Sequence, residues 1–143
     1  ALSSAASDVY KRQSVSRPDE KSAKKKKQRY EKIALEAAQQ SGRGIVPEIM
    51  DMTSLEKAVK NDDSELKILF YEGGGESLKS MINQDIKSVS IYIGPEGGFE
   101  EKEVELIKAS GGKSASLGPR ILRTQTAPVA ALTAIMLLSN NLE

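Results

Sequence analysis

The sequence predicts an α/β fold in which a mostly parallel sheet is covered by helices on both faces. Short β-branched and aromatic segments alternate with helical segments, and two of the strands run directly into glycine-bearing turns. Strands separated by helices form parallel sheets, because each crossover returns the chain to the same edge. The 143 residues, 38 % hydrophobic and 29 % charged, suit one globular domain.

Periodicity, caps and breakers locate the predicted elements. Apolar residues at three- and four-residue steps predict a helix over 20–41, which Gly42 ends. Ser54 can cap the next helix, and Thr124 or Thr126 can cap the last one. Helices are expected at 20–41, 55–60, 77–83, 100–109 and 126–140, and strands at 45–49, 67–71, 89–93 and 114–117.

The last helix is apolar around almost its whole circumference. A helix of this kind is buried on all sides, and a domain this small covers one side with its own sheet. We therefore expect a second copy of the chain to cover the other side, giving a homodimer. A central core helix in a monomer is the alternative.

Composition excludes several classes of chemistry. The chain has no Cys and no His, so disulfides, Cys-ligated metal sites, HExxH zinc sites and serine–histidine triads are excluded. We expect no metal site. The apolar run Ala127–Leu138 is too short to span a bilayer, and no segment is typical of a signal peptide.

Charge divides the chain into a basic arm and an acidic body. Residues 1–30 hold nine basic and three acidic residues, a net charge of +6, whereas residues 31–143 have a net charge of −5. The run Lys24, Lys25, Lys26 and Lys27 with Arg29 can contact nucleic-acid phosphates. A solvated helix face or a disordered tail is the alternative. Residues 1–13 are interpreted as a disordered leader.

The first candidate turn is Gly94-Pro95-Glu96-Gly97-Gly98-Phe99, directly after a predicted strand. Glycines there let a ligand approach the main chain closely, although a plain strand-to-helix turn has the same composition. Glu96, Glu100, Glu101, Glu103 and Glu105 crowd the following helix N-terminus. That charge disfavours a triphosphate and favours a neutral or cationic ligand, such as adenosine attached to a sulfonium.

The second candidate turn runs from Leu117 to Ala127 and places Arg120 and Arg123 around an apolar pair. Such arginines can bind phosphate or polarise a carbonyl oxygen, and the alternative is that they cap carbonyls or form ion pairs. Two segments only superficially resemble nucleotide-binding motifs. Gly112-Lys113-Ser114 resembles the end of a P-loop but follows a helix instead of a strand, and the Gly73–Gly75 run lacks the third glycine of a dinucleotide fingerprint.

The two motifs IGPEGGF and LGPRILRTQTA, in this order and separation, resemble the RNA uridine-N3 methyltransferases of the SPOUT superfamily, which modify small-subunit (16S) ribosomal RNA in bacteria. The stretch from Arg29 to Ile49 fits as well, so the resemblance covers roughly 14–138. It implies a fold whose C-terminal stretch threads through a loop to form a trefoil knot, a homodimer, ribosomal RNA as substrate, and a cytoplasmic or organellar location.

The resemblance also implies S-adenosyl-L-methionine as methyl donor, bound in the knot. The cofactor-binding residues carried over to this sequence are Phe70, Tyr71, Glu72, Gly94, Pro95, Glu96, Gly97, Gly98, Leu117, Gly118, Arg120, Ile121 and Leu122. The catalytic candidates are Arg120, Arg123, Arg43 and Glu96, and Arg43 joins the basic run in holding RNA.

Three departures from the family pattern stand out. Gln125 replaces a frequent Glu, and Glu100 replaces a frequent Ser, giving up the hydroxyl of a capping box while keeping a favourable charge. Residues 1–13 do not match the opening strand and helix, or the PUA-type RNA-binding barrel that precedes them in the family. We therefore interpret residues 14–143 as a methyltransferase domain without its opening strand and helix.

Two mechanisms and three functions remain open at this point. A general base would be a carboxylate such as Glu96, or solvent; alternatively, an arginine stabilises negative charge on the uracil oxygens, which requires no unusual carboxyl pKa. The competing functions are a catalytically inactive RNA-binding or dimerisation fragment of this fold, and a nucleotide-binding α/β protein.

Overall fold

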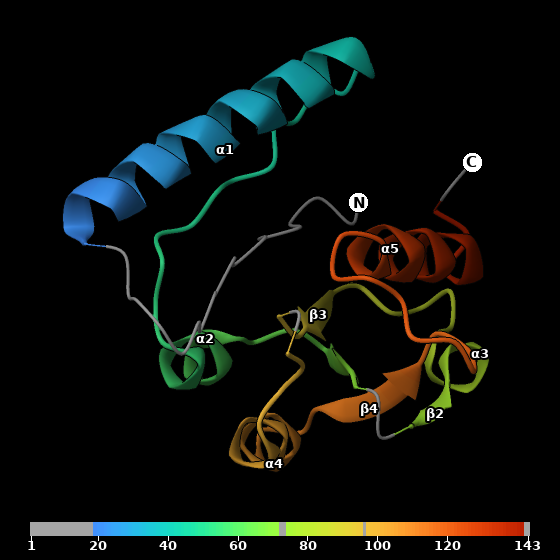
Figure 1. Cartoon of the computed structure of the whole chain (residues 1–143). Helices are drawn as coiled ribbons and strands as arrows, with labels where there is room; N and C mark the ends of the chain where they lie inside the picture. Colours follow the sequence, from blue (N-terminus) through green and yellow to red (C-terminus); the bar gives the residue numbers. More distant parts are fainter. Residues whose placement is uncertain (1–18, 72–73, 96, 142–143) are drawn as a thin grey trace. The chain divides into compact units, whose positions relative to one another are not determined.

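The computed structural model describes residues 19–71, 74–95 and 97–141, which form two compact units (Figure 1). The first unit contains residues 19–58 and the second contains residues 59–141. Helix α2 (Leu55–Asn61) contains the boundary between them. Among the described residues, no helix combines the length and the apolar character that crossing a membrane requires.

Helix α1 (Glu20–Gln40) dominates the first unit and is capped at both ends. The Asp19 carboxylate accepts a hydrogen bond from Ser22 N at 2.8 Å. At the other end Gly42 has φ +68°, Gly42 N donates to Gln39 O and Arg43 N donates to Ala38 O. This is the Schellman arrangement, in which glycine takes the left-handed conformation and the last carbonyls are satisfied.

The prediction of a strand at 45–49 is wrong. Residues 46–54 have no regular secondary structure, and Ile45 and Val46 are exposed. Within described residues 19–58 there is no other strand for this segment to pair with, and Pro47 lacks an N–H to donate. The segment is instead tied to α1 by an ion pair, in which Lys27 Nζ lies 2.7 Å from Asp51 Oδ1.

The second unit contains a four-stranded parallel sheet with the order β2-β4-β1-β3. The strands are β1 (Leu66–Phe70), β2 (Glu76–Ser77), β3 (Val89–Ile93) and β4 (Lys113–Ser116). In the register of the central strand, Phe70 of β1 is opposite Ile93 of β3 and Ala115 of β4. The carboxyl ends of these three strands therefore meet at one edge of the sheet.

Helices cover both faces of this sheet, as the sequence predicts (Figure 1). On one face, α3 (Leu78–Met81) and α5 (Ala127–Leu138) pack against β1 and β4. The buried core there consists of Ile68, Phe70, Leu78, Met81, Ile82, Ala115, Ala131 and Ile135. Leu69 alternates to the other face, where α4 (Glu101–Ala109) buries Val104 and Ile107.

Other elements lie close to their predicted positions, with two differences. β2 was not expected and takes Ser77 from the predicted helix, because it pairs with β4 only through tertiary contact. Thr126 occupies the N-cap of α5 without a side-chain cap, and Thr124 provides none either; Pro128 in the first turn lacks the N–H that a cap would satisfy. One side of α5 is exposed in the single chain, where Val129 and Leu137 are 66 % and 62 % exposed; this is the side that a second copy was expected to cover.

A polar network joins the loop after α2 to β3. The Asp62 carboxylate accepts hydrogen bonds from Ser64 N and Ser90 Oγ, both at 2.9 Å, and from the Tyr92 hydroxyl. Partial burial of Asp62 raises its pKa, but hydrogen bonds from Tyr92, Ser64 and Ser90 outweigh this and hold the pKa below its usual value. The network therefore stabilises the fold when Asp62 is ionised.

We predict that Tyr92→Phe lowers the free energy of unfolding by about 1 kcal/mol at pH 7, since a bond to a charged group is worth ~1.5–3 kcal/mol when buried and this carboxylate is partly exposed. Because the pKa of Asp62 is lowered on folding, its contribution is present above the ordinary carboxyl range and is lost as the pH falls below about 4. Urea unfolding from pH 3 to 7 should show the variant and the wild type converging at low pH. A constant difference would contradict this account.

Gly75 faces the backbone of β4 so closely that a side chain is excluded. A Cβ added there would lie 2.4 Å from the carbonyl carbon and oxygen of Ser114. We predict that Gly75→Ala lowers the free energy of unfolding by about 1–3 kcal/mol, because backbone must move to admit the methyl group. Gly44→Ala is the control, since a Cβ there meets nothing within 4 Å. Equal stabilities of the two variants would contradict the prediction.

Candidate functional site

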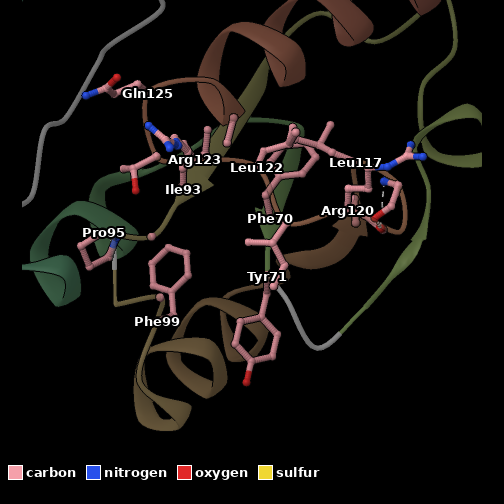
Figure 2. A pocket seen from close by; sticks show the side chains of 18 of the residues that line it. Phe70, Tyr71, Ile93, Pro95, Phe99, Leu117, Arg120, Leu122, Arg123 and Gln125 are labelled. Atoms are coloured by element: carbon pink, nitrogen blue, oxygen red, sulfur yellow. Dashed lines mark hydrogen bonds between the residues drawn. The ribbon is translucent and has the colours of Figure 1, made fainter.

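A cavity of about 790 Å³ lies where the carboxyl ends of β1, β3 and β4 meet (Figure 2). Its walls are the ends of these strands and the loops that follow β3 and β4. Open parallel sheets bind ligands at this edge, because the loops after the strands leave a crevice there. Its size is within the range of small-molecule sites, roughly 300–1,000 Å³.

The loop after β3 closes on itself. Gly98 N donates to Pro95 O at 2.8 Å, and Gly98 has φ +73°. A Cβ added at Gly94 would lie 3.1 Å from the Gly98 carbonyl carbon, from Phe99 N and from Phe99 Cδ2. The two ends of the loop are therefore in contact, and glycine is needed at 94 for close approach and at 98 for conformation. Glu96 lies outside the described residues.

Gly97 is different, because neither requirement applies to it. Its φ is not in the left-handed region, and a Cβ added there would meet nothing within 4 Å. Gly97 nevertheless lines the cavity. The fold of this chain therefore gives no reason for glycine at this position, whereas close approach of a ligand to the main chain would give one.

The loop after β4 is held by local hydrogen bonds. Ser116 Oγ bonds to both Gly118 N and Gly118 O at 3.1 Å, and Gly118 has φ +112°. Farther along, Arg123 O accepts from Thr126 N at 2.8 Å and Ala127 N at 3.0 Å, which starts α5. The intervening Ile121 is 76 % exposed, an unusual position for a large apolar side chain.

Arg120 and Arg123 lie on opposite sides of the Phe70 and Leu122 side chains (Figure 2). Both arginines line the cavity and are exposed. They do not converge on one point, so each can contact a different group of a ligand. Among the lining residues that the structure describes, Arg120 and Arg123 are the charged ones.

The described acidic residues after the loop lie at the N-terminal end of α4, as the sequence indicates, and do not line the cavity. Of the expected glutamates, Glu100, Glu101, Glu103 and Glu105 are described, and none is among the lining residues. Glu100 and Glu103 instead form a reciprocal capping box, in which Glu100 N donates to Glu103 Oε2 at 2.9 Å. Glu100 lacks the hydroxyl of the frequent Ser, as the sequence indicates, but its carboxylate also accepts from the N3 amide, so the box is kept.

The structure brings together the described members of the predicted cofactor set. All of them line this cavity: Phe70, Tyr71, Gly94, Pro95, Gly97, Gly98, Leu117, Gly118, Arg120, Ile121 and Leu122. Glu72 and Glu96 lie outside the described residues. The other lining residues lie outside the predicted cofactor set; they are Ile93, Phe99, Ala115, Ser116, Pro119, Arg123, Thr124, Gln125 and Ala127. Arg123 had been assigned to catalysis alone. Adjacency to the glycine turns is the signal that could have found most of the others.

The predicted RNA-contacting residues belong to the first unit. Lys24, Lys25 and Lys26 lie on α1 with Arg29, while Lys27 is paired with Asp51 and lies 3.9 Å from Glu31. Arg43 closes the Schellman turn through its backbone and has an exposed side chain. Among described residues 19–71, 74–95 and 97–141, no group of three or more acidic side chains is arranged to hold a metal ion.

Most of the chain matches one known protein family. A model described as "RNA methyltransferase domain" matches residues 7–136. The Ribosomal RNA small subunit methyltransferase E of Bacillus subtilis (strain 168) is 42 % identical over 130 residues, which cover 85 % of this chain and 51 % of that protein. The protein of the same name from Aquifex aeolicus is 34 % identical over 113 residues, covering 78 % and 48 %.

Solved structures agree with these similarities. A Legionella pneumophila protein assigned as a methyltransferase, with the cofactor SAM bound, has a TM-score of 0.81 and 31 % identity, and the match covers 90 % of this chain and 52 % of that one. The Ribosomal RNA small subunit methyltransferase E from Neisseria gonorrhoeae, bound to S-adenosyl methionine, has a TM-score of 0.76 and 33 % identity over 81 % and 49 %. The chain thus spans about half the length of the relatives it matches.

Proposed function

The chain belongs to the RNA methyltransferase domain family, and from that premise we propose that it is an S-adenosyl-L-methionine-dependent methyltransferase that modifies N3 of a uridine in small-subunit ribosomal RNA. Residues 14–143 would form its methyltransferase domain, acting in ribosome maturation in the cytoplasm. The observation that carries the proposal is the single cavity lined by both motifs, IGPEGGF and LGPRILRTQTA.

The residues of the cavity fit this cofactor. Phe70, Ile93 and Leu122 offer apolar surface, which suits an adenine ring. The loops around Gly97 and Gly118 present main-chain groups at an accessible wall, so they can satisfy the polar edge of the base. Gly97, which the fold alone does not require, leaves the space that a side chain would fill.

The chemistry divides between the donor and the protein. When bound, S-adenosylmethionine supplies a methyl group activated by a sulfonium. The protein must then hold the uracil in position and favour loss of the N3 proton, and positioning alone can supply ~7–11 kcal/mol of barrier reduction. An arginine beside a uracil oxygen stabilises the negative charge that develops as N3 loses its proton.

Arg123 is the strongest candidate for this role among the described residues. It lines the cavity beside Gln125, on the opposite side from Arg120 (Figure 2). We assign Arg123 to the uracil and Arg120 to another part of the bound ligands. Arg43 would hold RNA, and Glu96 stays a prediction as general base, since neither residue is placed at the cavity by the described structure.

The basic helix α1 is proposed to hold RNA phosphates through Lys24, Lys25, Lys26 and Arg29. These side chains project from a solvent-facing helix, and phosphate contacts of this kind supply affinity without sequence specificity. Lys27 takes part only when its ion pair with Asp51 gives way.

The exposed apolar side of α5 supports the proposal of a homodimer. Val129, Leu132 and Leu137 are 66 %, 41 % and 62 % exposed, while Ala131 and Ile135 face the core. Exposed apolar surface of this kind is typical of an interface, and a second copy of the chain would cover it. A trefoil knot formed by the C-terminal stretch is proposed on the resemblance to the family.

The second candidate is a catalytically inactive fragment that binds RNA or dimerises. Gln125 favours it, because an amide cannot act as a base where relatives often have a carboxylate. Thermal unfolding with S-adenosylmethionine, and with ATP and NAD as controls, separates the candidates. Ligand at about a hundred times its Kd should raise the free energy of unfolding by roughly 2.7 kcal/mol. A shift with none of the three ligands would favour the inactive fragment.

We predict that Gly97→Ala weakens S-adenosylmethionine binding without weakening the fold. The methyl group meets no protein atom within 4 Å, so the free energy of unfolding should stay equal or rise by up to about 1 kcal/mol. A steric conflict of about 1–3 kcal/mol with the cofactor corresponds to roughly a 5- to 150-fold increase in Kd. Isothermal titration calorimetry measures the Kd, and wild-type affinity in this variant would remove Gly97 from the cofactor site.

We predict that Arg123→Ala lowers the single-turnover methylation rate on small-subunit ribosomal RNA by about 100-fold, the usual effect of losing one preorganised charge-stabilising group. The Kd for S-adenosylmethionine should change little, since this side chain is assigned to the uracil. Arg120→Ala is the matched comparison from the same loop. An unchanged rate for Arg123→Ala would exclude it from the mechanism.

A further inference from the structure

The ring of Phe99 rests against the first residue of the loop that it follows. A Cβ added at Gly94 would lie 3.1 Å from Phe99 Cδ2 and 3.1 Å from Phe99 N. Contacts of 3.0–3.4 Å are tighter than ordinary van der Waals contact. The ring and its backbone therefore occupy the space that any larger residue at 94 would need.

This contact adds to a hydrogen bond that closes the described part of the loop. Within it, Gly98 N donates to Pro95 O at 2.8 Å. Two of its glycines, Gly97 and Gly98, have no side chain with which to pack. Glycine loses more conformational freedom on ordering than any other residue, so a segment of this composition needs an external constraint to keep one shape.

Phe99 lies at the cavity and not in the hydrophobic core. It lines the cavity, is partly buried, and is absent from the core cluster that α3 and α5 form with the sheet. Figure 2 shows its ring between Pro95 and Tyr71. A large aromatic ring placed on a glycine at the rim of a cavity stabilises the shape of that rim more than the fold as a whole.

We propose that Phe99 is a positioning residue, whose ring packs on Gly94 and holds Gly94, Pro95, Gly97 and Gly98 in the conformation that receives the cofactor. This inference rests on the proposed function, because it takes S-adenosylmethionine as the ligand. Phe99 acts through the main chain of the loop: it keeps the loop ordered before the ligand arrives, so that binding does not have to order it.

The test compares Phe99→Ala with Phe99→Tyr. Fixing one residue's backbone corresponds to roughly a five- to thirtyfold factor in an equilibrium constant, so the Kd of Phe99→Ala for S-adenosylmethionine should rise about tenfold. Phe99→Tyr keeps the ring and should bind within about twofold of the wild type. Amide hydrogen exchange without ligand should be faster at Gly97 and Gly98 in Phe99→Ala, with no change in β1 and β3.

Met81→Ala is the matched control for general destabilisation. Met81 is a buried core residue of α3 and does not line the cavity. This variant should unfold more readily, with wild-type Kd and wild-type exchange at Gly97 and Gly98. Equal losses of affinity in Met81→Ala and Phe99→Ala, or wild-type affinity in Phe99→Ala, would overturn the inference.

The experiment also separates this inference from the proposed function. If the wild type does not bind S-adenosylmethionine, the proposed function fails. The exchange rates at Gly97 and Gly98 still decide whether Phe99 orders the loop: faster exchange in Phe99→Ala supports that role, and unchanged exchange overturns it.

Discussion

The pairing of β1 between β3 and β4 is the constraint on which the rest of the second unit depends. β1 hydrogen-bonds on both sides, and its residues Ile68 and Leu69 are fully buried on opposite faces. Because all three strands are parallel, their carboxyl ends lie at one edge, and the loops after β3 and β4 leave the sheet at that edge on either side of β1. Two motifs separated by residues 100–116 in the sequence thereby line one cavity.

Much of the fold was predictable because it follows from local signals. β3 combines β-branched and aromatic residues, and the glycine turns and capping residues set the ends of α1 and α4. The segment 45–49 has the composition of a strand but pairs with no strand among the described residues, and β2 has a partner but no strand-like composition. Pairing is a tertiary property, so residues such as Ile45 and Ser77 do not reveal it.

The candidate site was predictable in its membership and not in its geometry. Resemblance to a family indicates which residues gather, and the described members of that set line one cavity. The divergence of Arg120 and Arg123, and the use of Glu100 and Glu103 to cap α4, depend on side-chain directions. The sequence placed five carboxylates near the loop, and two of the described ones, Glu100 and Glu103, cap their own helix.

The ion pair between Lys27 and Asp51 has a consequence for how α1 would respond to salt. A cation that already has a carboxylate partner displaces no counterion from RNA unless it first gives up that partner. The logarithmic slope of RNA affinity against salt concentration should therefore count the unpaired cations of α1 and not its full basic content. In the proposed RNA-binding role of α1, Asp51 would act as an internal competitor for phosphate at Lys27 and would lower the non-specific attraction of the helix for other polyanions.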